Sequence, residues 1–186
     1  MSIDFHTIVQ TLQGGGVILH RPDTIWGLSC DATQPKAIEK IDVLKRRKAE
    51  KSYIVLVSNE AMLERYVQEV PEVAYDLIEA SVSPLTIIYP KGIGLASDVC
   101  AADGSVAIRV VQDKTTHDII HRLRKPIIST SANISGDEPP RAMEDVSESI
   151  QSGVDYIVHR SDKALSSKPS SILKLALNGE FTFIRA

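Results

Sequence analysis

Residues 126–136 read Pro-Ile-Ile-Ser-Thr-Ser-Ala-Asn-Ile-Ser-Gly, and this stretch decides how the rest of the chain is arranged. The apolar run 126–128 predicts a buried strand, and the segment Gly-Asp-Glu-Pro-Pro at 136–140 excludes a helix interior. Hydroxyl and amide side chains are therefore concentrated just past the end of a central strand. Ligands of open α/β sheets bind at that edge, so the stretch predicts a phosphate or carboxylate site. The alternative is a polar turn whose side chains bond only their own backbone.

The length and composition indicate one domain that spans residues 1–186. The chain has 43% hydrophobic and 24% charged residues, which is ordinary for a globular protein. Its net charge of −3 provides no overall basic field of the kind that marks a dedicated nucleic-acid binder. No apolar run reaches the length of a membrane span, and the N-terminus lacks the pattern of a signal peptide. Two cysteines, Cys30 and Cys100, form no metal-type pair, so we expect a cytoplasmic protein.

Helical and strand-like segments alternate along the sequence and predict an α/β fold with a twisted, mixed parallel and antiparallel sheet and flanking helices. Asn178-Gly179 between two apolar runs predicts a terminal hairpin. The expected helices are 3–13, 35–48, 59–66, 71–80, 115–124 and 143–151, and the expected strands are 17–19, 53–57, 83–89, 105–111, 126–128, 156–158, 171–177 and 180–185.

A basic cluster closes the predicted helix 35–48. Lys45, Arg46, Arg47 and Lys48 are followed by Lys51. Cations at a helix C-terminus suit the helix dipole, which is the simplest explanation. The alternative is an anion site, since polyphosphate needs several cations and arginine gives forked hydrogen bonds. Lys45 and Arg47 would diverge on a continuous helix, but they would converge if the helix ended between them.

Two further groups of candidate site residues lie in or next to predicted strands. Asp23 and Thr24 lie in a turn after the first strand, and Trp26 follows them as a core residue or a ligand contact. Arg109 lies within the apolar strand 105–111, where a buried arginine needs a paired anion. Either an internal carboxylate or a ligand must supply that charge.

Other chemical motifs are incomplete. No Gly-Lys-Ser/Thr follows the glycines at 14–16, and His117 and His121 lack a third metal ligand. The sequence also has no Gly-x-Ser-x-Gly elbow. The inventory of hydroxyls, an amide and separate cations suits a reaction that depends on positioning and charge stabilisation, such as nucleotidyl transfer.

Taken in order, six segments resemble the YrdC-like family, the threonylcarbamoyl-AMP synthases, in its short form without an extra C-terminal domain. They are Arg21-Pro22-Asp23-Thr24-Ile25-Trp26-Gly27-Leu28, Lys45-Arg46-Arg47 with Lys51, Ser83-Pro84-Leu85-Thr86, Ala107-Ile108-Arg109-Val110, residues 129–136, and Pro169-Ser170-Ser171. The resemblance covers residues 8–175, and the Ser-Thr-Ser-Ala-Asn-x-Ser-Gly block and the Lys-x-Arg pair are its most specific parts.

The resemblance implies a YrdC-like fold with a concave basic site, and an enzyme that makes threonylcarbamoyl-adenylate and pyrophosphate from L-threonine, bicarbonate and ATP. Partner proteins would transfer the product to tRNA. It assigns no nucleophile, gives Lys45 and Arg47 an electrostatic role, and implies Mg²⁺ held mainly through phosphates and water, with no strong protein metal site. The implied ATP contacts are Lys45, Arg47, Thr86, Ser131, Asn133 and Arg141, and the implied threonine and carbamate contacts are Asp23, Thr24, Lys51 and Arg109.

The sequence departs from the family pattern mainly near the expected amino-acid pocket. Pro22 replaces the first threonine of the usual Pro-Thr-Asp-Thr turn, Ser52 stands where proline or glycine is usual, and residues 81–84 lack the usual Pro-Gly. One alternative is therefore an adenylating relative with a different amine substrate. Another is a non-catalytic module on the same fold that binds RNA weakly and in a salt-sensitive manner.

Overall fold

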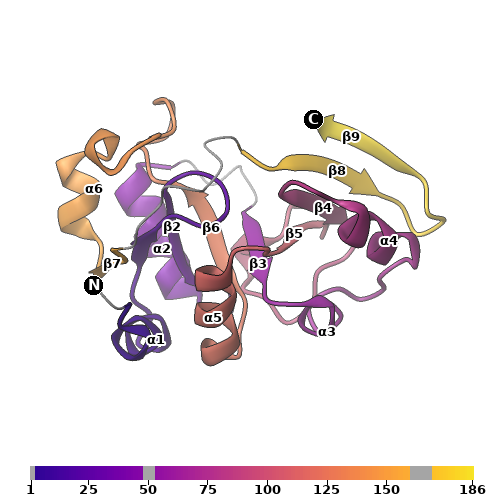
Figure 1. The fold of residues 1–186 in the computed structure, drawn as a ribbon, viewed down its shortest axis with the longest axis horizontal. Helices are drawn as coiled ribbons and strands as arrows, with labels where there is room; N and C mark the ends of the chain where they lie inside the picture. The colour runs from indigo at the N-terminus through magenta and orange to yellow at the C-terminus, as the bar shows by residue number, and fades with distance from the viewer. Residues whose placement is uncertain (1–2, 48–52, 160–168) are drawn as a thin grey trace.

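In the computed structural model, which describes residues 3–47, 53–159 and 169–186, one mixed sheet organises the protein (Figure 1). Across the described residues, its strand order is β7-β1-β2-β6-β3-β5-β4-β8-β9. The strands are β1 Ile18–His20, β2 Gly27–Asp31, β3 Ile54–Val57, β4 Leu85–Tyr89, β5 Val106–Val110, β6 Ile127–Ser131, β7 Tyr156–Ile157, β8 Ser171–Leu175 and β9 Phe181–Arg185. The helices are α1 Phe5–Gln13, α2 Pro35–Lys45, α3 Glu60–Leu63, α4 Val73–Ala80, α5 Lys114–Leu123 and α6 Glu148–Gly153, with 3₁₀ turns η1 Ser97–Val99 and η2 Met143–Asp145.

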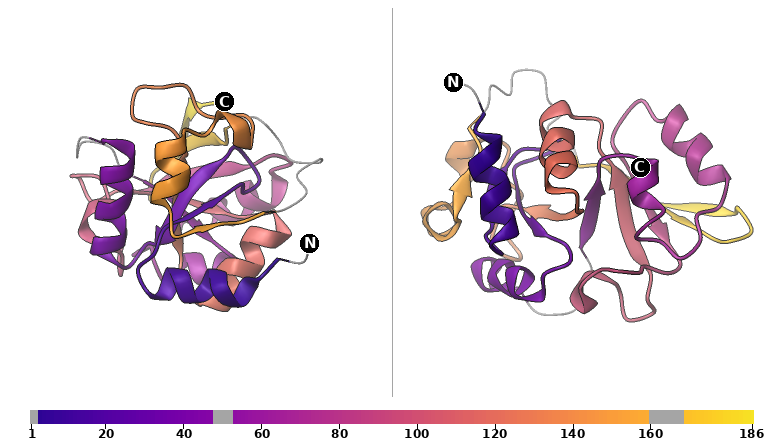
Figure 2. Two further views of the ribbon diagram at one scale, coloured as in Figure 1. Left: turned by 90° about the vertical axis from the view of Figure 1, so that its left-hand side faces the viewer. Right: turned by 90° about the horizontal axis from the view of Figure 1, so that it is seen from below.

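The pairing confirms the predicted mixed sheet. β3 pairs in parallel with β5 and β4 with β8, whereas β2 and β3 both run antiparallel to β6. The terminal hairpin β8–β9 forms one edge of the sheet, and the short strand β7 forms the other edge (Figure 1). Helices α1 and α5 pack side by side, and α2 packs against β2 and α6 (Figure 2).

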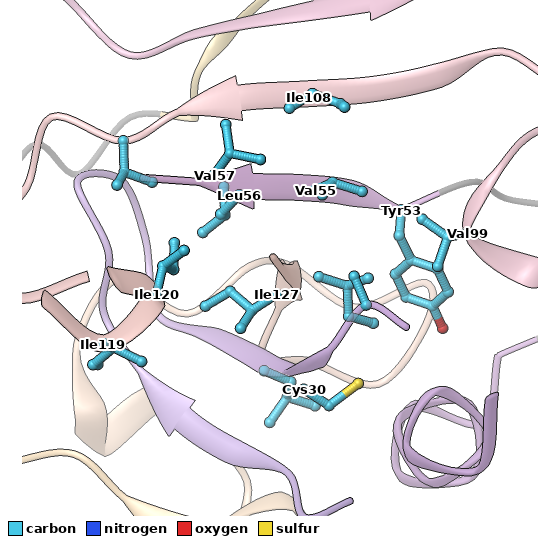
Figure 3. Packing of buried hydrophobic residues seen from close by; sticks show 14 of the residues in the cluster. Cys30, Tyr53, Val55, Leu56, Val57, Val99, Ile108, Ile119, Ile120 and Ile127 are labelled. Atoms are coloured by element: carbon cyan, nitrogen blue, oxygen red, sulfur yellow. The ribbon is translucent and has the colours of Figure 1, made fainter. Parts of the chain in front are cut away.

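The core follows from the apolar strands at the centre of the sheet. Val55, Leu56 and Val57 of β3 are fully buried, which matches the continuous apolar run that predicted this strand. Ile119 and Ile120 of α5 pack over the same region (Figure 3). Helix α5 begins where the Asp113 side chain accepts a hydrogen bond from the Thr116 amide at 2.8 Å, and α2 begins with Pro35 in its first turn.

Several predictions were wrong. Strand β2 was not predicted, and α3 is shorter than the predicted helix 59–66. The predicted helix 35–48 ends at Lys45, because Arg46 takes a left-handed conformation with φ of 50°. The predicted helix 143–151 is divided into η2 and α6. The strand predicted at 126–128 continues as β6 to Ser131, because β2 pairs with it along its whole length. No described helix is both long and apolar enough to cross a membrane.

Candidate active site

An open cavity of about 240 Å³ lies over one end of the central strands and gathers several of the predicted site residues. Its wall combines main chain and hydroxyls of β6 with the start of β2 and with three arginines from distant parts of the chain. The lining residues are Thr24, Ile25, Trp26, Gly27, Arg47, Tyr53, Ile54, Arg109, Ser129, Thr130, Ser131, Pro139, Pro169, Ser170 and Arg185.

The end of α2 separates the two predicted cations of the Lys-x-Arg pair. The left-handed Arg46 donates its main-chain N–H back to Asp42 and Val43 and terminates the helix. Arg47 then lies in the cavity wall, with its guanidinium 4.1 Å from the ring centre of Tyr53 and 3.4 Å from the Thr130 hydroxyl. The condition that the sequence analysis set for convergence, a helix end between Lys45 and Arg47, is therefore met, but the two side chains do not converge.

Lys45 points into the protein instead. Its side chain is 3% exposed, and its ammonium donates to the main-chain carbonyls of Ser131 and Asn133, the latter at 2.7 Å. The Ser135 amide donates to the Lys45 carbonyl at 2.8 Å, so the helix end is fastened to the 131–135 segment twice. Burial, and secondarily the charge of Arg47, lower the pKa of Lys45 to about 8. Lys45 is not among the cavity-lining residues, so its expected direct contact with ATP has no counterpart in this geometry.

Arg109 is buried within β5, and an internal carboxylate neutralises it. Its guanidinium lies 3.0 Å from the carboxylate of Asp23. Burial lowers the pKa of Arg109, and the charge of Asp23 opposes that change. The Nε atom of Arg109 has no hydrogen-bond partner among the described residues, and Arg109 is one of the residues that line the cavity. Arg109 thus keeps a donor for a ligand, whereas Asp23 serves as its counter-ion rather than as a lining residue.

The polar segment 129–136 contributes to the site in two different ways. Ser129, Thr130 and Ser131 are half-buried and line the cavity. The Asn133 amide nitrogen donates to the carbonyls of Ile134 and Asp137 at 2.9 and 2.8 Å. Its Oδ1 atom is buried without a hydrogen-bond partner among the described residues, and Asn133, like Lys45, is not among the cavity-lining residues.

The remaining predicted residues lie in different places. Thr24 lines the cavity, but Thr86 does not; its buried hydroxyl contacts the Ser170 hydroxyl at 2.8 Å behind the wall. Arg141 is exposed and outside the lining set, and its main-chain N–H donates to Asp145 at 3.0 Å. Lys51 lies outside the described residues.

Arg185 is the arginine of the cavity that the sequence did not reveal, and Tyr53 is a further lining residue without a predicted role. Arg185 ends β9, and its guanidinium donates to the Ser170 carbonyl at 2.9 and 2.7 Å, which places it in the cavity wall. A lone cation at the end of an edge strand gives no local signal. Only the pairing of Arg185 with Ile172 across the hairpin brings it to the cavity.

The site defines an α/β protein with a basic cavity: three guanidiniums line it, and none of its lining residues in the described part of the chain is a carboxylate, which suits an anionic ligand. The sequence matches the family Sua5_yciO_yrdC, described as "Telomere recombination", over residues 10–186. The chain therefore belongs to the Sua5/YciO/YrdC family.

Two curated relatives match this chain over most of their own length. A threonylcarbamoyl-AMP synthase of Hahella chejuensis is 34% identical over 169 residues, covering 88% of this chain and 89% of the relative. A threonylcarbamoyl-AMP synthase of Vibrio campbellii is 30% identical over 172 residues, covering 91% and 92%.

Solved structures confirm the fold. E. coli YciO superposes with a TM-score of 0.83 at 22% identity, covering 97% of this chain and 87% of that protein. P. abyssi Sua5 complexed with L-threonine superposes with a TM-score of 0.84 at 24% identity, covering 94% of this chain and 52% of the longer protein.

Proposed function

We propose that this protein is a threonylcarbamoyl-AMP synthase, a nucleotidyltransferase that makes threonylcarbamoyl-adenylate and pyrophosphate from L-threonine, bicarbonate and ATP. The observation that carries the proposal is the meeting of Arg47, Arg109 and Arg185 with the hydroxyls of residues 129–131 in one cavity. Relatives with 30% identity and more over most of their length bear the same activity in their names.

The reaction explains why such a site needs cations. The threonine amine and bicarbonate form a carbamate and release water. A carbamate oxygen then attacks the α-phosphorus of ATP, the bond to the β-phosphate oxygen breaks, and pyrophosphate leaves with the electron pair. The carbamate and ATP are both anionic, so the protein must offset their repulsion before they can meet in line.

The described side chains divide this task. Arg47 in the cavity wall and the exposed Arg185 suit the triphosphate and the leaving pyrophosphate. Thr24 and the free Nε of Arg109 suit the carboxylate or carbamate of the amino-acid substrate. Asn133 lies outside the lining residues, but its buried Oδ1 has no described partner, and we propose it as the acceptor for a ligand donor such as a ribose hydroxyl or the adenine amine.

Mg²⁺ would enter with the nucleotide rather than at a protein cage. The described residues contain no group of three or more His, Cys, Asp or Glu that could hold a metal ion. When bound to the triphosphate, the ion supplies charge neutralisation of the phosphate oxygens. We further propose a cytoplasmic location and transfer of the adenylate product to partner proteins that modify tRNA.

The decisive experiment is substrate omission. Incubation with ATP, Mg²⁺, bicarbonate and L-threonine should release pyrophosphate and form the adenylate, and omission of threonine should abolish both. Arg47→Ala and Asn133→Ala should each reduce turnover sharply in a folded protein. Arg46→Ala is the matched control, because it removes the neighbouring exposed arginine and should leave turnover near that of the wild type.

Two other results would replace the proposal. Pyrophosphate release that ignores threonine would indicate an adenylating relative with a different amine substrate, which the altered turn at Arg21-Pro22 motivates. No release, together with RNA binding that weakens steeply with salt, would indicate a non-catalytic RNA-binding module.

A further inference from the structure

Tyr53 lies beneath the arginine of the Lys-x-Arg pair. It stands directly before β3, is 3% exposed, and packs beside Val99 (Figure 3). The Arg47 guanidinium carbon lies 4.1 Å from the centre of the Tyr53 ring, which is a close cation–π contact. The ring therefore forms a flat support under a cation that faces the cavity.

Asp42 joins the two side chains from the last turns of α2. Its Oδ1 accepts a short hydrogen bond from the Tyr53 hydroxyl and lies 4.0 Å from Nε of Arg47. The Arg47 side chain is 9% exposed and that of Asp42 is 31% exposed. Ring, carboxylate and the Thr130 hydroxyl thus contact one guanidinium from three sides.

We propose that Tyr53 and Asp42 are positioning residues that hold the Arg47 guanidinium in the orientation that receives an anionic reactant. The inference rests on the proposed function, in which this cavity takes the triphosphate of ATP. A free arginine must lose rotamer freedom when it binds a phosphate, whereas a guanidinium already fixed by a ring and a carboxylate loses little. The gain therefore appears in affinity and turnover rather than in a new ligand contact.

A purely structural role for Tyr53 would not require this arrangement. A leucine would fill much of the same apolar space, but it would offer no ring face to the guanidinium and no hydroxyl to Asp42. Burial and the hydrogen bond to Asp42 raise the pKa of Tyr53, so the phenol stays protonated and remains a donor. The carboxylate in turn is fixed at a distance at which it attracts Arg47 without forming a tight pair with it.

The test compares variants that remove the ring or only the hydroxyl. Tyr53→Leu should lower kcat/KM for ATP about tenfold, because a partly desolvated cation–π contact is lost. Tyr53→Phe and Asp42→Asn should each lower it by a smaller factor, about threefold, because the ring remains. Tyr75→Phe is the matched control. It also removes a tyrosine hydroxyl, which donates to the Glu64 carboxylate at 2.8 Å, and Tyr75 does not line this cavity.

A double-mutant cycle separates positioning from mere packing. In an Arg47→Met background, Tyr53→Leu should cause no further loss of kcat/KM or of ATP and pyrophosphate binding measured by calorimetry. The same loss in both backgrounds would overturn the inference. Urea denaturation checks that each variant folds, and if Tyr53→Leu does not fold, Tyr53→Phe and Asp42→Asn in the same cycle decide the question.

The outcomes also distinguish this inference from the proposed function. Wild-type protein that makes the adenylate, with no coupling between Tyr53 and Arg47, would retain the function and overturn the inference. Coupling in ATP binding by a protein that makes no adenylate would retain the inference and overturn the function.

Discussion

Replacement of Lys45 by methionine removes a buried ammonium while keeping a side chain of similar length. At pH 7 two effects oppose each other. The carbonyls of Ser131 and Asn133 lose a charged donor, which costs about 1–3 kcal/mol, and the cost of burying the charge disappears. The net change at one pH is therefore a poor test, whereas the pH dependence of the difference between wild type and variant isolates the titration of Lys45.

The sign of that dependence follows from the two pKa values. The ordinary pKa of lysine, 10.5, applies to the unfolded chain, whereas burial and Arg47 lower the folded-state pKa of Lys45 to about 8. Between these values the unfolded state binds more protons than the folded state, so the free energy of unfolding of the wild type rises with pH relative to the variant. From pH 7 to pH 9 the expected rise is about 1.4 kcal/mol, because pH 9 lies one unit above the folded-state pKa and each such unit changes the free energy of unfolding by about 1.4 kcal/mol.

Urea denaturation of the wild type and Lys45→Met at pH 7, 8 and 9 measures this difference. Lys40→Met is the control, since Lys40 also belongs to α2 and donates to a main-chain carbonyl, that of Gly15 at 3.0 Å, but its side chain is 52% exposed. A difference between wild type and Lys45→Met that stays flat or falls over this range would refute the reasoning. It would mean that the two carbonyls stabilise the ammonium enough to cancel the cost of its burial.

Two further substitutions test the cavity wall. Asp23→Asn should lower the free energy of unfolding by about 3–5 kcal/mol in urea denaturation, because Arg109 is left buried without its carboxylate; a loss below about 1 kcal/mol would show that Arg109 has another counter-charge. Gly27→Ala should cost about 1–3 kcal/mol, because its Cβ would lie 2.9 Å from the main-chain oxygen of Thr130, and unchanged stability would show that β2 and β6 can separate at this point.

Apolar runs predicted eight of the nine described strands, but they missed β2 and did not predict where polar strand ends stop. The sequence suggested that β6 ends at Ile128, because the apolar residues end there. The strand continues through Ser129, Thr130 and Ser131 because β2 supplies partners as far as the pair Gly27–Ser131. Such pairing is a long-range property, and local composition carries no information about it.

The candidate site shows the same limit for side-chain direction. The sequence identified both cations of the Lys-x-Arg pair and stated that a helix end between them would decide their positions. The left-handed conformation of Arg46 turns Lys45 toward the carbonyls of 131–133 and Arg47 toward the cavity. An arginine at position 46 does not predict a left-handed conformation. Arg185 was missed for a related reason, since only the β8–β9 pairing carries it to Ser170.

The three arginines of the cavity are balanced to different degrees, and this ordering suits a site that must both hold and release anions. Arg109 has a carboxylate at 3.0 Å and contributes little net charge, so it acts mainly through its free Nε donor. Arg47 lies 4.0 Å from the Asp42 carboxylate, while the described hydrogen bonds of the Arg185 guanidinium go to the neutral carbonyl of Ser170. By these contacts, the positive charge is less compensated at the exposed Arg185 than at the buried Arg109. In the proposed reaction, the exposed Arg185 would attract the triphosphate and the leaving pyrophosphate, and the buried Arg109, already paired with Asp23, would offer the amino-acid substrate a directional donor.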